Sequence, residues 1–255
     1  MSKKPTNIVR RAIEIIQKEG MRIFFKKALS YLTHQPLVLP YALLRIKSLN
    51  KKKLKFNNLV NFCFCDIRGL IMPAQVQGEI LELLRILDKM KPKVVLEIGT
   101  AGGGTLFLFS RIASDDTTII SIDLPGGKFG GGYPKWKIPL YKSFARKNSK
   151  IHLIRADSHN QETLEKVKNI LNDKKIDFLF IDGDHSYQGV KKDFEMYDSL
   201  VRKGGIIAFH DICFHPPETG CEVHSFWNEI RENFTYHEIV KDLNQGWGGI
   251  GVIYK

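Results

Sequence analysis

Ionisable side chains gather in two short segments, each of which directly follows an apolar run. The first segment holds Asp182, Asp184 and His185, and the second holds His210 and Asp211. Imidazole is the natural general base at neutral pH, and a neighbouring carboxylate can orient the ring or bind a cation. Packing alone rarely places so many ionisable groups together. The two segments therefore indicate one functional site that can do acid–base chemistry, provided that the two apolar runs are neighbours.

A glycine-rich loop between residues 99 and 104 indicates where a ligand approaches the backbone. The dinucleotide-binding pattern needs glycine at 99, 101 and 104, but Ala101 occupies the middle position. Glu97 stands directly before the loop, where a carboxylate would repel a pyrophosphate and suit a cationic ligand. The loop thus fits a pyrophosphate less well than a positively charged ligand.

Acidic residues also follow the next two apolar runs. Asp123 lies 24 residues after Gly99, at the position expected to bind the hydroxyl pair of a ribose. Asp157 and Ser158 end the following run, where a side chain could meet an adenine amine. A single aspartate at a strand end more often caps the next helix. Acids after four successive runs favour a ligand-binding site.

Apolar runs and helical stretches alternate along the chain after Pro73. Residues 74–89 have a helical pattern. Five continuously apolar runs follow, at residues 94–98, 118–124, 151–156, 176–181 and 205–209. Continuous runs are typical of parallel strands whose two faces are both covered by helices. Strands at 236–240 and 250–254 leave no room for a helix between them, which requires antiparallel pairing. The sequence predicts an α/β fold: a Rossmann-like, doubly wound sheet, mostly parallel, with a C-terminal antiparallel hairpin.

Four sequence motifs occur at the ends of the predicted strands. They are Val-Leu-Glu-Ile-Gly-Thr-Ala-Gly-Gly-Gly-Thr (95–105), Ser-Ile-Asp-Leu (121–124), Arg-Ala-Asp-Ser (155–158) and Ile-Asp-Gly-Asp-His-Ser-Tyr (181–187). Together they resemble class I S-adenosylmethionine-dependent methyltransferases. The last motif and residues 203–211 resemble the small-molecule and sugar O-methyltransferase branch, close to cephalosporin-hydroxylase-like and macrolide-sugar methyltransferases. The resemblance runs from about residue 73 to the C-terminus, and it implies a seven-stranded sheet whose last strand is antiparallel.

The resemblance implies that the chain binds S-adenosylmethionine through residues at matching positions. These residues are Glu97, Gly99, Thr100, Gly102, Asp123, Asp157, Ser158 and Asp182. The loop residues would approach the methionine part of the cofactor, Asp123 would bind the ribose, and Asp157 with Ser158 would lie near the adenine.

Catalytic roles for Asp182 and His185 are also implied by the resemblance. In the similar sugar methyltransferases the aspartate of this motif binds Mg²⁺, and the histidine three residues later acts as the general base. A Glu-Asp pair of metal ligands ends the next strand in that family, whereas this chain has His210 and Asp211. We therefore expect Asp182, Asp211 and His210 as metal ligands. Because a hard cation prefers oxygen ligands, Mg²⁺, a softer divalent metal and no metal at all stay open as alternatives.

Two glycine-rich loops border the predicted strand ends. Residues 126–136 contain five glycines together with Phe129 and Tyr133. This composition favours a mobile lid over cofactor and acceptor, although a surface insertion would have the same composition. Residues 245–249 favour the final hairpin turn, in which Trp247 could stack on a sugar.

Histidine and cysteine residues recur between residues 210 and 224. Their spacing matches no paired-cysteine zinc pattern, and Cys63 and Cys65 are not spaced as a standard redox pair. We interpret the four cysteines of the chain as free thiols of a cytoplasmic protein.

The formal net charge of +12 belongs entirely to the N-terminal end of the chain. Residues 1–60 contain 14 Lys and Arg but only two acids, whereas residues 61–255 contain 25 of each sign. Apolar residues between 8 and 32 recur at helical spacing. We interpret residues 1–65 as a basic amphipathic helical segment and residues 66–255 as the methyltransferase domain.

Such a basic helix could lie on an anionic membrane, or its apolar stripe could pack on the domain or on a second subunit of a homo-oligomer. Nucleic acid is not expected as a partner, because the domain itself is neutral and offers no basic track to the site. Residues 35–41, with two prolines, are interpreted as a linker or a pair of turns. The longest apolar run, residues 37–44, is too short to span a bilayer. The expected location is cytoplasmic, with peripheral contact at the inner membrane surface.

Taken together, the patterns predict an S-adenosylmethionine-dependent O-methyltransferase that modifies a hydroxyl of a sugar, a glycan or a related small molecule, as in glycan biosynthesis. His185 is the expected general base, beside a divalent metal at Asp182 and Asp211. One alternative is a Rossmann enzyme that binds NAD or a nucleotide sugar, which Glu97 and Ala101 disfavour. The other is a membrane-recruited binding module with a non-catalytic cofactor site.

Overall fold

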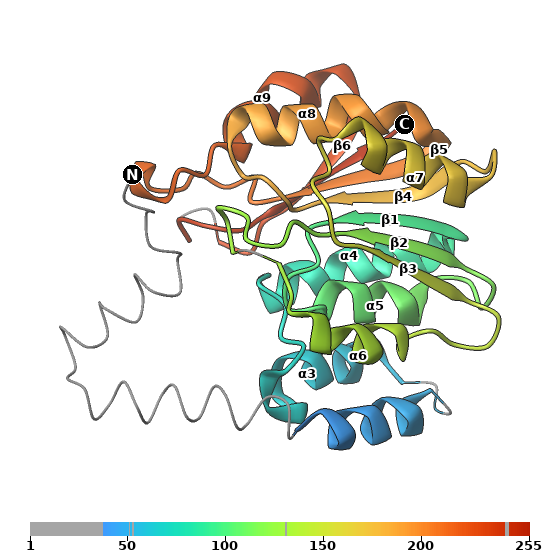
Figure 1. Ribbon diagram of the computed structural model, residues 1–255. Coiled ribbons are helices and arrows are strands. Elements are labelled where there is room, and N and C mark those ends of the chain that lie inside the picture. The colour runs from blue at the N-terminus through green and yellow to red at the C-terminus, as the bar shows by residue number, and fades with distance from the viewer. Residues whose placement is uncertain (1–37, 51, 53, 131, 243–244) are drawn as a thin grey trace, which may run out of the picture.

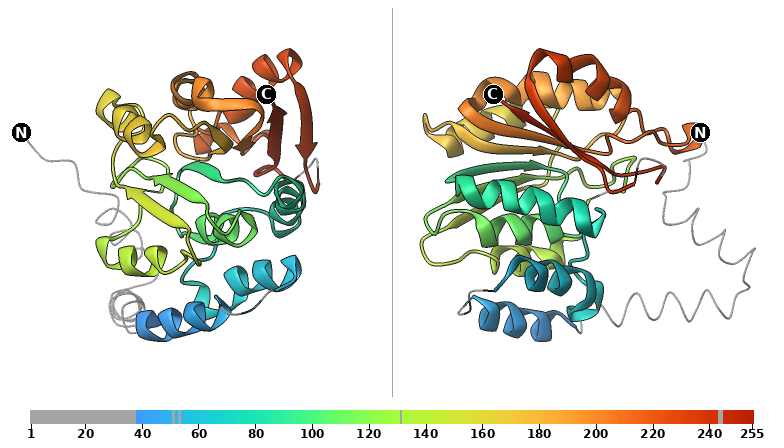
Figure 2. Two further views of the ribbon diagram at one scale, coloured as in Figure 1. Left: turned by 90° about the vertical axis from the view of Figure 1, so that its right-hand side faces the viewer. Right: turned by 180° about the vertical axis from the view of Figure 1, so that it is seen from behind.

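A computed structural model describes residues 38–255 except 51, 53, 131 and 243–244. The amphipathic helix predicted over residues 8–32 lies outside the described residues. In the described part, a central sheet is covered by helices on both faces (Figure 1). Figure 2 shows the same layers from the side and from behind.

The sheet has seven strands in the order β3-β2-β1-β4-β5-β7-β6. The strands are β1 (Val94–Ile98), β2 (Thr118–Ile122), β3 (Lys150–Ile154), β4 (Ile176–Ile181), β5 (Val201–His210), β6 (Thr235–Ile239) and β7 (Ile250–Tyr254). β1 to β5 pair in parallel, and β7 pairs antiparallel with both β5 and β6. The predicted mostly parallel sheet with an antiparallel C-terminal hairpin is confirmed.

Seven α-helices follow from residue 56 onward in the described chain. They are α3 (Phe56–Cys65), α4 (Gln77–Met90), α5 (Gly104–Ile112), α6 (Ile138–Lys142), α7 (Gln161–Leu171), α8 (Tyr187–Tyr197) and α9 (Val223–Ile230). Single 3₁₀ turns occur at Ile67–Gly69, Lys135–Lys137, Asp198–Leu200, Pro217–Thr219 and Arg231–Asn233. Helices α4, α5 and α6 cover one face of the sheet, and α7, α8 and α9 cover the other (Figure 1).

The central strands are mainly apolar because successive side chains enter two different cores. In β4, Phe178 and Phe180 pack on the α4–α5 side, whereas Leu179 packs on the α7–α9 side. Strand side chains point alternately to opposite faces, so a strand buried on both faces must be apolar at every position. This pattern fixes the sheet in the middle of the molecule and leaves its strand ends free to carry polar groups.

Residues 38–65 pack against the same core as α4 and α5. A helix covers residues 38–49, so residues 38–41 are not the linker or turns that the prolines suggested. Pro40 lies within this helix and is exposed. Ala42, Ile46 and Phe62 are buried in one cluster with Phe107 of α5. The border predicted at residue 65 stays a prediction.

Among the described residues, no helix combines the length and the apolar character needed to cross a bilayer.

Candidate active site

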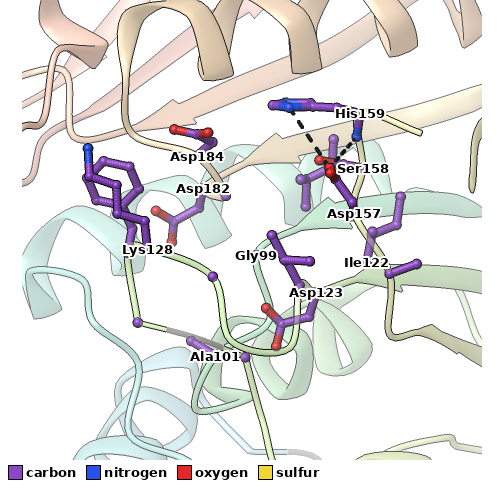
Figure 3. A pocket seen from close by; sticks show the side chains of 18 residues that line it. Gly99, Ala101, Ile122, Asp123, Lys128, Asp157, Ser158, His159, Asp182 and Asp184 are labelled. Atoms are coloured by element: carbon purple, nitrogen blue, oxygen red, sulfur yellow. Dashed lines mark hydrogen bonds and ion pairs between the residues drawn. The ribbon is translucent and has the colours of Figure 1, made fainter. Parts of the chain in front are cut away.

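A cavity of about 140 Å³ opens at the carboxyl ends of β1, β2 and β4. Its lining includes Gly99, Asp123, Asp157, Ser158 and Asp182, all of which the sequence predicted as cofactor ligands (Figure 3). These side chains follow different strands and meet because parallel strands end at one edge of the sheet. The structure thus brings five predicted site residues to a single cavity.

Gly99 allows the loop after β1 to lie directly on the chain after β4. Its φ is +94°, and a Cβ atom at this position would lie 1.9 Å from the carbonyl oxygen of Asp182. Gly102 has a different reason to be glycine, because a Cβ atom there would lie 2.4 Å from the carbonyl oxygen of Met72. Gly102 and Thr100 are not part of the cavity lining. The hydroxyl of Thr100 is buried against that of Ser121.

Glu97 lies in β1 and is fully buried outside the cavity lining. Ser121 Oγ donates a 2.7 Å hydrogen bond to Glu97 Oε2, and Oε1 has no hydrogen-bond partner among the described residues. Burial raises the pKa of Glu97 to about 8. The carboxyl group is therefore mostly protonated at neutral pH, and it does not present the fixed negative charge that the sequence argument assigned to it.

Asp123 and Asp157 present carboxylates to the cavity and also hold the backbone around it. The backbone N–H of Tyr133 donates a 3.1 Å hydrogen bond to Asp123 Oδ2, and that of His159 donates a 2.8 Å bond to Asp157 Oδ1. Burial raises the pKa of Asp123, although backbone N–H donors from the adjoining loops oppose this shift. These contacts fix where a ribose and an adenine could be bound.

His159 also lines the cavity, and sequence reasoning missed it. Its Nε2 lies 3.2 Å from Oδ1 of Asp193, a fully buried carboxylate in α8, and 3.1 Å from the carbonyl oxygen of Gly189. The hydrogen bond with Asp193 raises the pKa of His159 against the effect of burial. The only available signal was a histidine two residues after a strand-end aspartate, which no motif distinguishes.

We expect His159 to stabilise the fold more at pH 5.5 than at pH 9. Its folded-state pKa is raised above the unfolded value, so the contribution is complete below about pH 6.5 and is lost as pH rises through the folded-state pKa. Urea denaturation of the unchanged protein and of His159→Gln at both pH values measures this difference. His152→Gln is a control of opposite sign, because burial lowers the pKa of His152. An equal effect of His159→Gln at both pH values would contradict the assignment.

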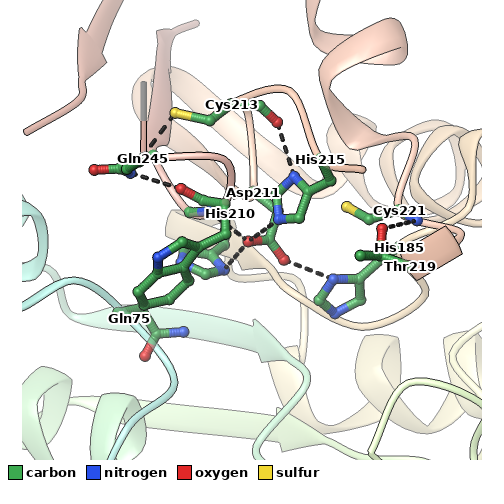
Figure 4. Close-up of polar contacts among 12 residues, drawn as sticks. Gln75, His185, His210, Asp211, Cys213, His215, Thr219, Cys221 and Gln245 are labelled. Carbon is green, nitrogen blue, oxygen red and sulfur yellow. Dashed lines mark hydrogen bonds and ion pairs between the residues drawn. The ribbon is translucent and has the colours of Figure 1, made fainter. Parts of the chain in front are cut away.

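The second group of predicted residues follows β4 and β5, which are neighbouring strands. His210 Nδ1 lies 3.2 Å from Asp182 Oδ1 and 3.2 Å from Asp211 Oδ1 (Figure 4). His185 Nδ1 lies 2.6 Å from Asp211 Oδ2, and His185 Nε2 lies 3.7 Å from Asp182 Oδ1. The expected shared site of two carboxylates and two imidazoles is therefore present.

Asp211 is the centre of this cluster. Besides His185 and His210, His215 Nε2 lies 3.2 Å from its Oδ1, and the backbone N–H of Gly248 donates a 3.1 Å hydrogen bond to the same oxygen. Burial opposes ionisation of Asp211, but the hydrogen bonds from His185 and His210 outweigh it and hold the pKa well below its usual range. Asp211 is therefore a buried anion surrounded by three imidazoles.

The pKa values of the imidazoles are shifted in the opposite direction, upward. Burial lowers the pKa of His185, but the bond to Asp211 and the nearby Asp182 outweigh this effect and raise it to about 11. His210 behaves alike, and the two aspartates raise its pKa to about 10 against complete burial. A cation placed among these carboxylates would lower both pKa values, because it repels the imidazolium charge.

Two sets of side chains in this cluster could hold a metal ion. One set is Asp182, His210 and Asp211, and the other is His185, Asp211 and Cys221; within each set the donor atoms lie within 4.8 Å of one another. Both ring nitrogens of His210 are buried and make no hydrogen bond of good geometry with the described residues. Mixed oxygen and nitrogen donors, with a thiol in the second set, suit a divalent transition metal better than Mg²⁺.

Cys221 was interpreted from sequence as a free thiol outside any site. It is free, as are the other described cysteines, but it lies beside His185 and Asp211. The donors of this set come from three separate segments after β4, after β5 and before α9. Linear spacing therefore contained no signal for it.

Gln75 and the hairpin connection complete the walls of the cluster. Gln75 Nε2, just before α4, donates a 2.7 Å hydrogen bond to Asp182 Oδ2 and was not predicted. The segment between β6 and β7 is the hairpin connection, as predicted. It also touches the site through Gly248, while Trp247 is exposed.

The glycine-rich loop after β2 reaches from the cavity to the cluster. Phe129 stacks on the His185 ring with centroids 5.0 Å apart and an interplanar angle of 25°. Tyr133, at the other end of the loop, is buried and packs on Tyr141. The loop thus has the position that a lid requires, and its movement stays a prediction.

Residues 96–212 match the family model of a methyltransferase domain. Over these residues the chain is similar to that family. A protein of Acanthamoeba polyphaga mimivirus, R132, is 31% identical over 143 residues, which cover 52% of this chain and 57% of that protein. The chain spans between 16% and 57% of the length of the curated relatives it matches.

Solved structures share the fold of this methyltransferase domain. An O-methyltransferase from Bacillus cereus in complex with S-adenosylhomocysteine aligns with a TM-score of 0.51 and 19% identity over 84% of this chain and 91% of that one. The calicheamicin enzyme CalS11, a TDP-rhamnose 3'-O-methyltransferase, aligns with a TM-score of 0.52 and 16% identity over 84% and 93%. At these identities the likeness shows the fold.

Proposed function

We propose that this methyltransferase domain binds S-adenosylmethionine and transfers its methyl group to a hydroxyl of a sugar or a related small molecule. One observation carries the proposal: the cavity lined by Asp123, Asp157 and Ser158 ends at Asp182, which also belongs to the His185 cluster. A nucleoside-bearing donor would thus have its reactive end beside an imidazole. A module that only binds a ligand would not need an imidazole beside the reactive end of that ligand.

The residues around the cavity fit this cofactor. The loop at Gly99 has no side chain to block a close approach, and Asp123 offers a carboxylate for a pair of ribose hydroxyls. Asp157 and Ser158 supply polar groups at the far end of the cavity for the adenine. When bound, S-adenosylmethionine supplies a methyl group on a sulfonium whose leaving group is a neutral thioether, so no general acid is needed.

His185 is the group of this chain that would take the proton from the acceptor hydroxyl, once a bound cation has lowered its pKa from about 11 and freed one ring nitrogen. Its Nδ1 is held by Asp211 at 2.6 Å, which leaves Nε2 as the nitrogen that can face an acceptor. Phe129 covers one face of the ring and would exclude water from it. Asp182, 3.7 Å from Nε2, would orient the acceptor or a metal that binds it.

A divalent metal is a further part of the proposal. Asp182, His210 and Asp211 would hold it, and it would supply a positive charge that lowers the pKa of a bound hydroxyl. A sugar acceptor is proposed because the His185 motif resembles that of sugar methyltransferases and because CalS11, which shares the fold, acts on TDP-rhamnose. Contact of residues 1–60 with an anionic membrane, and assembly into a homo-oligomer, are likewise proposals.

Calorimetry with S-adenosylmethionine, S-adenosylhomocysteine and NAD tests the cofactor. We expect the first two to bind and NAD not to bind. Asp123→Asn should weaken S-adenosylmethionine by about 10–100-fold, because it removes charge-assisted hydrogen bonds to the ribose. Asp116→Asn, exposed just before β2 rather than after it, is the matched control and should change nothing. Absence of binding at millimolar S-adenosylmethionine would refute the proposed function.

A further inference from the structure

A second cleft, with a volume of about 550 Å³, lies at the amino ends of the strands, opposite the cavity at their carboxyl ends. Its walls are the ends of the helix at residues 38–49, α4 and α5, together with the segment before β3. The cofactor and acceptor site follows the carboxyl ends of the strands, whereas these segments precede β1, β2 and β3. The cleft therefore has no part in the proposed methyl transfer.

Arg111, at the end of α5, is a buried cation in this cleft. Arg111 is 9% exposed. Its Nε and Nη2 atoms are buried and have no hydrogen-bond partner among the described residues. Nη1 donates to the side-chain oxygen of Asn50, and the guanidinium carbon lies 4.4 Å from the centroid of the Phe107 ring. Neither partner carries a negative charge, and no described carboxylate makes an ion pair with Arg111. An unpaired charge in this position is costly unless an anion accompanies it.

Four further cations line the same cleft, against two acids. Asp115 pairs with Arg146 and Lys147, and Asp88 pairs with Lys91. The ammonium of Lys52 has no ion-pair partner in the described part of the chain and is exposed at the mouth. The acids are thus already engaged, and positive charge remains in excess around Arg111.

Arg146 is held in place rather than free to move away. Its Nε donates to the carbonyl oxygen of Ser110 at 3.2 Å, and its Nη2 donates to that of Arg111 at 3.1 Å. Burial, and then the charge of Arg146, lower the pKa of Arg111 to about 9. A bound anion would relieve both effects, since it would neutralise the repulsion and satisfy the free donors of the guanidinium.

We propose that this cleft is a binding site for a phosphate group, with Arg111 as its central ligand and Lys52 at its mouth. A guanidinium offers parallel N–H donors that match two oxygens of a phosphate, and several fixed cations favour a group with more than one charged oxygen. The phosphate could belong to a soluble phosphate ester or to the headgroup of an anionic lipid. Because residues 1–60 of the chain are strongly basic, the headgroup of an anionic lipid is the first source to test.

Thermal unfolding of the full chain with inorganic phosphate at constant ionic strength tests the site. At a phosphate concentration ten times its Kd, we expect Tm to rise by about 3–6 °C. Arg111→Met should abolish the rise while keeping the packing of the side-chain stem on Phe107. Lys52→Glu, which alters only an exposed side chain, should weaken the phosphate effect by about 10-fold and guards against a misfolded Arg111 variant. Lys166→Met, exposed on α7, is the matched control.

Sedimentation with vesicles of phosphatidylglycerol or phosphatidylcholine separates the two sources. If Arg111→Met loses the phosphate response and also binds phosphatidylglycerol vesicles several-fold more weakly, the site holds a lipid headgroup. If it loses the phosphate response but binds vesicles like the unchanged protein, the site holds a soluble phosphate ester. The proposal is overturned if phosphate does not raise the Tm of the unchanged protein. It is also overturned if phosphate raises the Tm of Arg111→Met and of Lys52→Glu as much as that of the unchanged protein.

Discussion

Replacing His185 with glutamine is expected to lower the rate of methyl transfer by about 10²–10⁴-fold while S-adenosylmethionine binds almost unchanged. Glutamine retains hydrogen-bonding capacity toward Asp211 but cannot accept a proton from a hydroxyl. His185 is not part of the cavity lining, so the affinity for the cofactor should not depend on it. The expected signature is a loss in kcat with little change in cofactor Kd.

Release of S-adenosylhomocysteine, with TDP-rhamnose and catechol offered as acceptors, measures this loss, and calorimetry measures the cofactor affinity. His237→Gln, an exposed histidine of β6, is the matched control and should retain full activity. Unchanged turnover in His185→Gln would exclude the histidine as the base. Loss of cofactor binding would show instead that His185 belongs to the cofactor site.

The fold was largely predictable because its determinants are local and repeated. Each strand of the parallel part contains an apolar run, and β6 and β7 are too close in sequence for anything but antiparallel pairing. What failed was the segment around Pro40, where the prolines suggested turns but residues 38–49 form a helix. Proline signals a helix boundary without saying on which side of it the helix lies.

The site was predictable where a residue stands directly after a strand. Asp123, Asp182, His210 and Asp211 meet for that reason, since parallel strands end at a common edge. Three other residues of the site, Gln75, His159 and Cys221, lie on segments whose path over this edge depends on tertiary packing. Their spacing in the sequence therefore does not predict that they belong to the site. For Glu97, the sequence could not show that complete burial raises its pKa, and its role toward a cofactor stays a prediction.

Arg111 illustrates the same limit for surfaces remote from the active site. In the sequence it is one basic residue near the end of an otherwise apolar stretch. Only the packing of residues 38–65 against α5 buries it and brings Lys52 to its side. The cleft therefore gathers cations that lie far apart in the sequence, of which only Lys52 belongs to the basic N-terminal end, and composition could not indicate it.

Asp211→Asn is expected to be among the most destabilising single substitutions in the domain. Asp211 is 6% exposed, and His185, His210 and His215 all lie within hydrogen-bonding distance of its two carboxylate oxygens. Removing one charge from a buried ionic cluster leaves its partners uncompensated, which typically costs about 3–5 kcal/mol. The amide of asparagine adds two donors where the imidazoles need an acceptor.

Urea denaturation in EDTA should therefore show a free energy of unfolding about 3–5 kcal/mol lower for Asp211→Asn than for the unchanged protein. Asp173→Asn, exposed in the turn before β4, is the matched control and should change stability by no more than about 0.5 kcal/mol. Equal stability of Asp211→Asn and the control would mean that the imidazoles are neutral and need no anion.

Because Asp211 belongs to both candidate metal sets, equilibrium dialysis against Zn²⁺ or Mn²⁺ should also show metal bound by the unchanged protein and lost from the variant. Metal retained by Asp211→Asn would contradict its assignment as a ligand, whatever happens to stability.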